Sequence, residues 1–142
     1  MEKLRWIQLS DIHFSGNEGY EIKRMRDSLI DQIKKITDDK VINFVVLSGD
    51  LVYQNASYDS QLKTFLESIV KTCNISKENL FIVPGNHDLK RNQPRTLLLE
   101  GIRKDKFKFE QDTVEQLQKD FKKYRTFFKK IKNQDENYLY KV

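Results

Sequence analysis

Three short clusters of polar residues carry the side chains in this sequence that could do chemistry. Asp11 and His13 stand two positions apart, Asp50 follows a glycine, and Asn86 and His87 follow another glycine. Aspartates, an imidazole and a side-chain amide oxygen are ligands for a divalent metal ion of intermediate hardness. The chain has 2 histidines, and both lie inside these clusters. The residue types therefore favour a metal site.

The first cluster could hold one ion. An extended backbone would point the side chains of Asp11 and His13 to the same side, because strands alternate with a period of two. A carboxylate and an imidazole could then bind one ion together. Each residue alone has a simpler explanation, since Asp11 could cap a turn and His13 could be a surface histidine.

The second and third clusters could complete the site. Asp50 has two oxygens and could bridge a pair of ions, and Gly49 allows a tight turn beneath it. Asn86 could offer a neutral oxygen to a second ion, or it could hold a left-handed turn. His87 could be another ligand or a group that faces the substrate. Asp88 could be the N-cap of a following helix.

The elements that would position these clusters alternate along the chain. Strands are predicted at 3–9, 41–47 and 80–83, and helices at 20–37 and 58–72. Each polar cluster follows one of the strands. Because sites in open α/β sheets form at the carboxyl ends of the strands, the three loops should converge. The order predicts an α/β domain with at least partly parallel strands.

The apolar residues indicate how these elements pack. The nearly apolar segment 41–47 predicts a strand that is buried on both faces. Trp6 and Phe14 are expected in the core rather than stacked on a substrate. The helix at 20–37 has an apolar stripe at three- and four-residue spacing. Its members are Ile22, Met25, Leu29, Ile33 and Ile36.

The second half of the chain predicts further helices. A helical stretch begins at Pro94, and a clearer Lys-rich helix is predicted within 109–132. One apolar stripe on that helix would pack on a neighbouring element. Its members are Val114, Leu117, Phe121, Tyr124, Phe128 and Ile131. Residues 138–142 could begin another strand.

Composition predicts a globular protein of the cytoplasm. Of the 142 residues, 38% are hydrophobic and 33% are charged, which is typical of a folded domain. No apolar run approaches the ~20 residues of a membrane span, so no membrane association is expected. The N-terminus lacks the apolar region of a secretory signal. The single cysteine, Cys73, cannot form an internal disulfide, which fits a reducing compartment.

The positive charge is concentrated in one segment. Residues 90–132 hold 14 Lys/Arg and 6 Asp/Glu, a balance of +8 within a chain of net charge +5. Such a segment could attract a polyanion. The simpler interpretation is a solvated helical face.

The three clusters resemble the opening signature of the calcineurin-like metallophosphoesterase superfamily, which reads D-x-H, G-D and G-N-H-D/E. The matching segments are Ser10-Asp11-Ile12-His13, Ser48-Gly49-Asp50-Leu51 and Pro84-Gly85-Asn86-His87-Asp88. The resemblance covers residues 3–90. It implies the N-terminal part of a four-layer α/β sandwich at 1–89. Residues 90–132 would then be a basic helical insertion, and 133–142 the start of the next strand.

The resemblance also implies a role for each residue. Asp11 and His13 would hold the first of two divalent metal ions, Asp50 would bridge both, and Asn86 would bind the second. Mn, Fe or Zn would suit these mixed ligands. His87 would be catalytic, facing the phosphate ester rather than binding metal. Around these residues, the following would shape the turns: Gly49, Gly85 and Asp88.

Two features separate this sequence from the protein Ser/Thr phosphatases of the superfamily. Tyr53 occupies the place of a second aspartate, and Asp88 the place of a glutamate. The segment 49–58, with Val83-Pro84 and Lys90-Arg91, looks like bacterial phosphodiesterase-like members. Nuclease members share the same motifs, so DNA or RNA is an alternative substrate.

The resemblance also leaves part of the expected site unfilled. The superfamily completes the site with a later histidine and a G-H-x-H motif, whereas no histidine follows His87. The expectation is therefore an incomplete and inactive piece of a metal-dependent phosphoesterase. Downstream domains or a second chain would supply the missing imidazoles. The alternative from another class is a non-catalytic module that binds nucleic acid or a protein partner.

Overall fold

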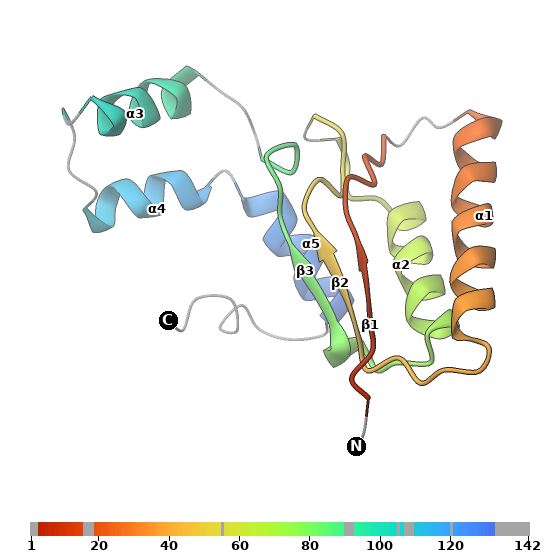
Figure 1. Cartoon of the computed structure of the whole chain (residues 1–142). Coiled ribbons are helices and arrows are strands. Elements are labelled where there is room, and N and C mark those ends of the chain that lie inside the picture. The colour runs from red at the N-terminus through yellow and green to blue at the C-terminus, as the bar shows by residue number, and fades with distance from the viewer. Residues whose placement is uncertain are drawn as a thin grey trace.

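The computed structural model describes residues 3–15, 19–54, 56–89, 93–104, 106, 110–119 and 121–132. Three short strands, five α-helices and a 3-10 turn make up this part of the chain (Figure 1). In order they are β1 (Trp6–Leu9), α1 (Tyr20–Thr37), β2 (Phe44–Ser48), α2 (Ser60–Thr72), η1 (Lys77–Asn79), β3 (Leu80–Val83), α3 (Gln93–Arg103), α4 (Gln111–Lys119) and α5 (Lys122–Lys132). The predicted α/β class is confirmed.

The three strands form one parallel sheet in the order β1-β2-β3. Leu9 of β1 pairs with Leu47 of β2, which pairs with Ile82 of β3, so the strands end at nearly the same level. The predicted strands are confirmed, although β1 and β2 begin three residues later than expected. All three polar clusters therefore follow strands that end at one edge of the sheet.

One face of this sheet packs against helices. Val45, Leu47, Leu80 and Ile82 point to that face and are buried in a core shared with α1, α2 and α5. This core contains the members Ile33, Leu62, Phe65, Leu66, Ile69, Tyr124, Phe127 and Ile131. Burial of apolar area on this scale is the main driving force for holding the helices on the sheet.

The opposite face of the sheet is open in the described part of the chain. Trp6 is 54% exposed, Phe81 51% and Val83 52%. The expectation that β2 is buried on both faces is therefore wrong, because Phe44 and Val46 are only half-buried. Trp6 is likewise not a core residue, although its ring stacks on Phe44 at a centroid distance of 5.9 Å.

Helix α1 has the predicted bounds, but the residues that face the core are not all those of the predicted apolar stripe. Ile33 is buried, whereas Met25 is 71% exposed and Ile36 is 53% exposed. The core-facing positions include Arg26, whose guanidinium lies 4.3 Å from the ring centroid of Phe14. This cation–π contact puts an arginine where an apolar residue was expected. Phe14 itself is fully buried, as predicted.

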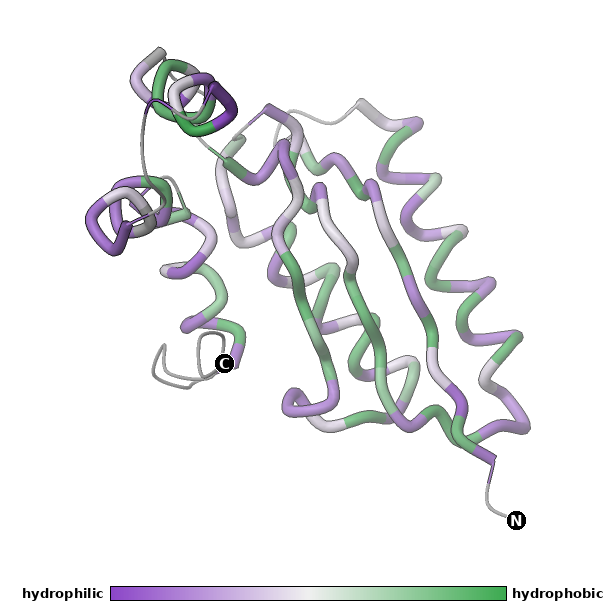
Figure 2. Tube along the Cα trace, turned by 60° about the vertical axis from the view of Figure 1, so that its left-hand side comes forward, coloured by the Kyte–Doolittle hydropathy of each residue, from purple (hydrophilic) through white to green (hydrophobic). Residues whose placement is uncertain are grey.

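The Lys-rich segment 109–132 contains two helices rather than one. Helix α4 ends at Lys119, and α5 begins at Lys122. In Figures 1 and 2, α3 and α4 stand apart from the sheet on the β3 side, while α5 lies against the rest of the domain. The apolar stripe predicted for a single helix is therefore divided between α4 and α5. Phe127, which was not predicted as part of that stripe, is buried. The strand expected at 138–142 lies outside the described residues.

Helix α5 is fixed to strand β3 near one end and to η1 at the other. The phenol of Tyr124 donates a hydrogen bond of 2.7 Å to the Ile82 carbonyl. At the other end, the Lys132 ammonium donates to the Lys77 carbonyl at 2.6 Å. Burial lowers the pKa of Lys132. None of the helices described here is long and apolar enough to cross a membrane.

Candidate metal centre

The loops after β1 and β2 are joined by backbone hydrogen bonds at the carboxyl edge of the sheet. The N–H of Asp11 donates to the Gly49 carbonyl at 3.3 Å, and the N–H of His13 donates to the Asp50 carbonyl at 2.9 Å. Phe14 and Val52 form a parallel bridge just beyond. The strand pairing thus continues through both polar clusters and fixes one against the other.

Three of the candidate ligands have left-handed backbones. Asp11 has φ 55°, His13 φ 50° and Asp50 φ 49°, and Gly49 before Asp50 has φ 100°. The extended conformation expected for Asp11 and His13 is therefore wrong. A left-handed backbone costs a non-glycine residue about 1–2 kcal/mol. Such residues concentrate at functional sites, where the surrounding structure holds them in place.

The side chains still converge despite this different backbone. Asp11, His13 and Asp50 each offer a ligand atom, and these atoms lie within 4.8 Å of one another. His13 Nε2 lies 3.6 Å from Asp11 Oδ1. His13 Nδ1 is buried and has no hydrogen-bond partner among the described residues. Two carboxylates and an imidazole gathered this closely make a mixed oxygen and nitrogen ligand set, so the residues fit a divalent metal ion.

The loop after β3 packs tightly against Asp50. The backbone N–H of His87 donates to Asp50 Oδ1 at 2.7 Å. A Cβ atom at Gly85 would lie 2.2 Å from the same oxygen and 2.4 Å from the Asp50 nitrogen, so only glycine fits there. Asn86, which lies between Gly85 and His87 in the sequence, is exposed. The third cluster thus adjoins the other two.

The Asp88 side chain connects the loop after β2 to the loop after β3. Its side chain is fully buried. Oδ2 accepts hydrogen bonds from the backbone N–H groups of Leu51 at 3.1 Å and Gly85 at 2.8 Å. Oδ1 accepts from the N–H of Val52 at 3.0 Å and from the Tyr58 phenol at 2.8 Å. Asp88 therefore braces both turns rather than starting a helix.

The Tyr58 phenol is held in its neutral form by its surroundings. Burial raises its pKa far above the ordinary value, and the neighbouring Asp88 carboxylate adds to the effect. A neutral phenol can donate its proton to Asp88, whereas a phenolate could not. The bond therefore connects the start of α2 to the turn after β3.

The imidazole of His87 is oriented by the loop after β2. The N–H of Gln54 donates to His87 Nδ1 at 3.4 Å. The Tyr53 ring stacks on the His87 ring at a centroid distance of 5.4 Å and an interplanar angle of 14°. The His13 ring lies edge-on at 4.9 Å. Because Nδ1 accepts this hydrogen bond, the proton of the neutral ring belongs on Nε2.

Sequence reasoning overlooked three contributors to this site. Gln54 and Tyr58 were not singled out, and Tyr53 was noted only for replacing an aspartate. Their contacts join residues 30 or more positions apart, such as Tyr58 with Asp88 and Gln54 with His87. Gln54 also has a left-handed φ of 46°. No local sequence signal marks such long-range partners.

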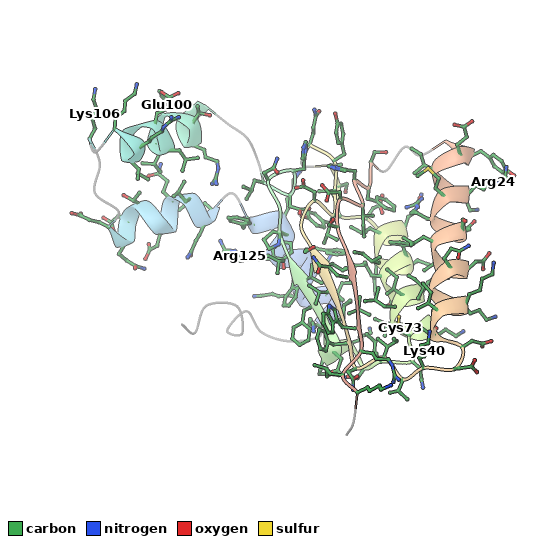
Figure 3. The ribbon with its side chains drawn as sticks, in the orientation of Figure 1. Arg24, Lys40, Cys73, Glu100, Lys106 and Arg125 are labelled. Atoms are coloured by element: carbon green, nitrogen blue, oxygen red, sulfur yellow. The ribbon has the colours of Figure 1, made fainter. Side chains whose placement is uncertain are left out.

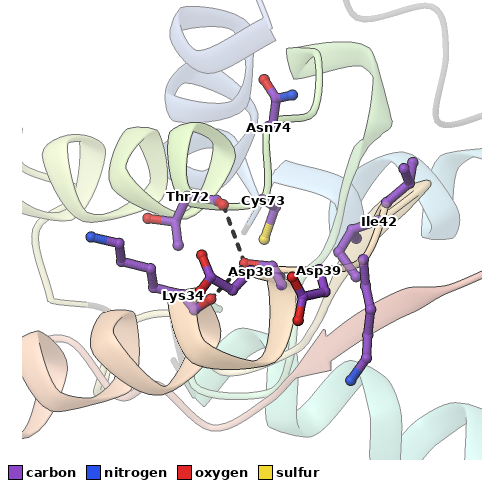
Figure 4. Close-up of a pocket in the computed structure, with 10 residues that line it drawn as sticks. Lys34, Asp38, Asp39, Ile42, Thr72, Cys73 and Asn74 are labelled. Atoms are coloured by element: carbon purple, nitrogen blue, oxygen red, sulfur yellow. Dashed lines mark hydrogen bonds between the residues drawn. The ribbon is translucent and has the colours of Figure 1, made fainter.

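A cavity of about 490 Å³ lies at the opposite end of the sheet (Figure 4). It is lined by residues from the end of α1, the α1–β2 connection and the end of α2, including Lys34, Lys40 and Cys73. Figure 3 shows Lys40 and Cys73 at this end, away from the loops that follow the strands. The cavity is therefore separate from the metal-ligand cluster.

A parallel sheet that gathers two aspartates and a histidine at its carboxyl edge defines an α/β metal-binding domain. The chain belongs to the calcineurin-like phosphoesterase family, whose model matches residues 4–140. It is 38% identical over 102 residues to the uncharacterized metallophosphoesterase-like protein YydB of Bacillus subtilis (strain 168). That match covers 72% of this chain but 21% of the relative, so the chain spans about a fifth of its length. No solved structure matches the chain significantly.

Proposed function

We propose that this chain is the N-terminal part of a metal-dependent phosphodiesterase. Asp11 and His13 would hold one divalent ion, Asp50 would be shared between two ions, and Asn86 would hold the second. His87 faces the phosphate ester. Residues 1–89 form this half of the catalytic domain, and residues 90–132 are a helical insertion. Mn, Fe or Zn suits the mixed oxygen and nitrogen ligands, and the cytoplasm suits the buried free thiol of Cys73.

One observation carries this proposal. Ligand atoms from Asp11, His13 and Asp50 lie within 4.8 Å of one another, although His13 and Asp50 are 37 positions apart in the sequence. Family membership supports a metal-dependent phosphoesterase.

The protein groups have distinct tasks in such a reaction. Divalent ions supply Lewis acidity and lower the pKa of coordinated water. Asp50 must stay aligned to serve both ions, and the His87 N–H holds one of its oxygens. His87 Nε2–H, positioned by the Gln54 N–H and the Tyr53 ring, donates a hydrogen bond to the phosphate or a proton to the leaving oxygen.

The described ligands do not fill two metal sites. A catalytic metal centre needs three or more protein ligands per ion as well as open positions. We infer that further imidazoles come from outside these 142 residues, either from downstream sequence or from a second chain. This predicts weak metal binding and no turnover by the chain alone.

Hydrolysis of a chromogenic phosphodiester in millimolar Mn²⁺ tests the proposal. The assay compares this chain and a longer protein that contains it, each with Asp50→Asn and Asp38→Asn variants. Asp38 is an exposed control at the opposite end of the sheet. We expect turnover by the longer protein that is lost in Asp50→Asn and kept in Asp38→Asn. Retained activity in Asp50→Asn would refute the bridging role. Asp50-dependent turnover by the 142-residue chain would indicate that another copy supplies the missing ligands.

A further inference from the structure

A cavity of about 300 Å³ lies between α5 and the loop that precedes α2. Its lining consists of Ser57, Tyr58, Lys122, Lys123, Thr126, Phe127 and Lys130. None of these seven residues is acidic, and three are lysines. A small cavity with this balance attracts an anion, because its walls concentrate the positive potential.

The lysines occupy one face of α5. Lys122, Thr126 and Lys130 stand at four-residue spacing, which places neighbouring side chains on the same side of a helix. Lys122 is also the first residue of this 11-residue helix, where the backbone dipole is positive. The Thr126 hydroxyl donates to the Lys122 carbonyl at 3.0 Å, so the charged donors are the ammonium groups. Ammonium groups bind phosphate as compact point charges.

The cavity shares a residue with the bracing of the candidate metal centre. Tyr58 is one of the residues that line the cavity. Its hydroxyl donates to Asp88 Oδ1 at 2.8 Å. Asp88 directly follows His87 in the sequence. Tyr58 would therefore stand between a ligand in the cavity and the loop that carries His87.

We propose that this cavity binds a second, non-scissile phosphate group of the substrate. The inference rests on the proposed function for its link to hydrolysis, and it narrows the substrate to a molecule with more than one phosphate. A nucleic-acid strand and a small bisphosphate ester share this chemistry. The basic balance of residues 90–132 favours a substrate with several phosphates, because each one neutralised adds to binding.

Binding of a fluorescein-labelled oligothymidylate, followed by fluorescence anisotropy across a range of salt concentrations, tests the inference. The variant is Lys122→Gln/Lys130→Gln. The matched control is Lys34→Gln/Lys40→Gln, which removes the same charge from the cavity at the opposite end of the sheet. For a single strand, each lost phosphate contact reduces the slope of log K against log salt by about 0.7, so we expect a reduction of about 1.4 in the variant. The control should keep the wild-type slope.

An equal change in both double variants would overturn the inference, because only net charge would then matter. The binding assay contains no metal ion, so its outcome is separate from the hydrolysis assay that tests the proposed function. Competition distinguishes the two sources of phosphate. Displacement by a small bisphosphate ester supports the small substrate, whereas displacement by unlabelled oligonucleotide alone supports the nucleic acid. Displacement by neither would overturn the site.

Discussion

The backbone N–H of His87 donates a hydrogen bond of 2.7 Å to the side-chain Oδ1 of Asp50. These residues lie 37 positions apart, in loops that follow neighbouring strands. The bond fixes the carboxylate that we propose as the bridging ligand. It also places the His87 backbone next to that carboxylate. The geometry of the centre therefore depends on how closely the third loop approaches the second.

Gly85→Ala should disrupt this approach. The added methyl group would lie 2.2 Å from Asp50 Oδ1 and 2.4 Å from the Asp50 backbone nitrogen, so one loop must move. Overpacking of this kind costs about 1–3 kcal/mol. We expect a loss of that size in the free energy of unfolding, measured by urea denaturation. Gly19→Ala is the control, because a methyl group there meets no atom within 4 Å. Equal stability of the two variants would contradict the close contact.

Asp88→Asn should destabilise the domain although it is nearly isosteric. The carboxylate accepts hydrogen bonds from four donors, and an amide would turn an NH₂ group toward two of them. Unsatisfied buried donors cost about 1–3 kcal/mol each, so we expect a loss of about 3 kcal/mol in urea denaturation.

The matched control for Asp88 is Asp59→Asn. Asp59 is the N-cap of α2 and accepts from the N–H groups of Gln61 and Leu62. Asparagine caps helices about as well as aspartate, so this variant should stay close to wild type. If both variants lost the same stability, the bracing role of Asp88 would be wrong.

The Tyr58 phenol should make stability fall at alkaline pH. Its pKa in the folded state is raised above the ordinary value of 10.0, first by burial and then by Asp88. Below pH 10.0 the phenol is neutral in both states. Above pH 10.0 the unfolded chain releases the proton first, so the free energy of unfolding falls by up to about 1.4 kcal/mol per pH unit. Tyr58→Phe should lose this slope. Tyr20→Phe, at an 80% exposed site, should keep it.

Tyr124→Phe should loosen α5 from the sheet. The buried phenol donates to the Ile82 carbonyl at 2.7 Å, and the variant leaves that carbonyl without this donor. We expect a loss of about 1–2 kcal/mol in the free energy of unfolding. Hydrogen exchange that becomes faster than in wild type in α5, but not in α2, would show that the effect is local. Unchanged exchange in α5 would contradict the anchoring.

The alternation of strands and helices made much of this fold predictable. Apolar runs ending in polar turns located all three strands, and parallel strands bring their carboxyl ends to one edge. This reasoning correctly brought Asp11, His13 and Asp50 together. Helix α1 begins and ends where its periodicity predicts, because both ends fall in polar, turn-forming sequence.

The backbone and the bracing of the centre could not be predicted. Asp11 and His13 have left-handed backbones because Gly49 and Asp50 across the loop accept their N–H groups. Asp88 was expected to shape a turn, with a helix cap as the alternative, but its four donors could not be named because three of them lie 30 or more positions away. The break between α4 and α5 was also missed, because the apolar spacing continues through it. Pairings between distant segments decide each of these features.

Titration of the chain with Mn²⁺ by isothermal calorimetry tests the central claim most directly. The titration compares wild type with Asp50→Asn and with Asp38→Asn, which changes an exposed residue outside the cluster. Removing a ligand from a metal site weakens affinity strongly, so we predict at least about tenfold weaker binding for Asp50→Asn and wild-type binding for Asp38→Asn. Equal Mn²⁺ affinity in wild type and Asp50→Asn would contradict a metal centre built on Asp11, His13 and Asp50.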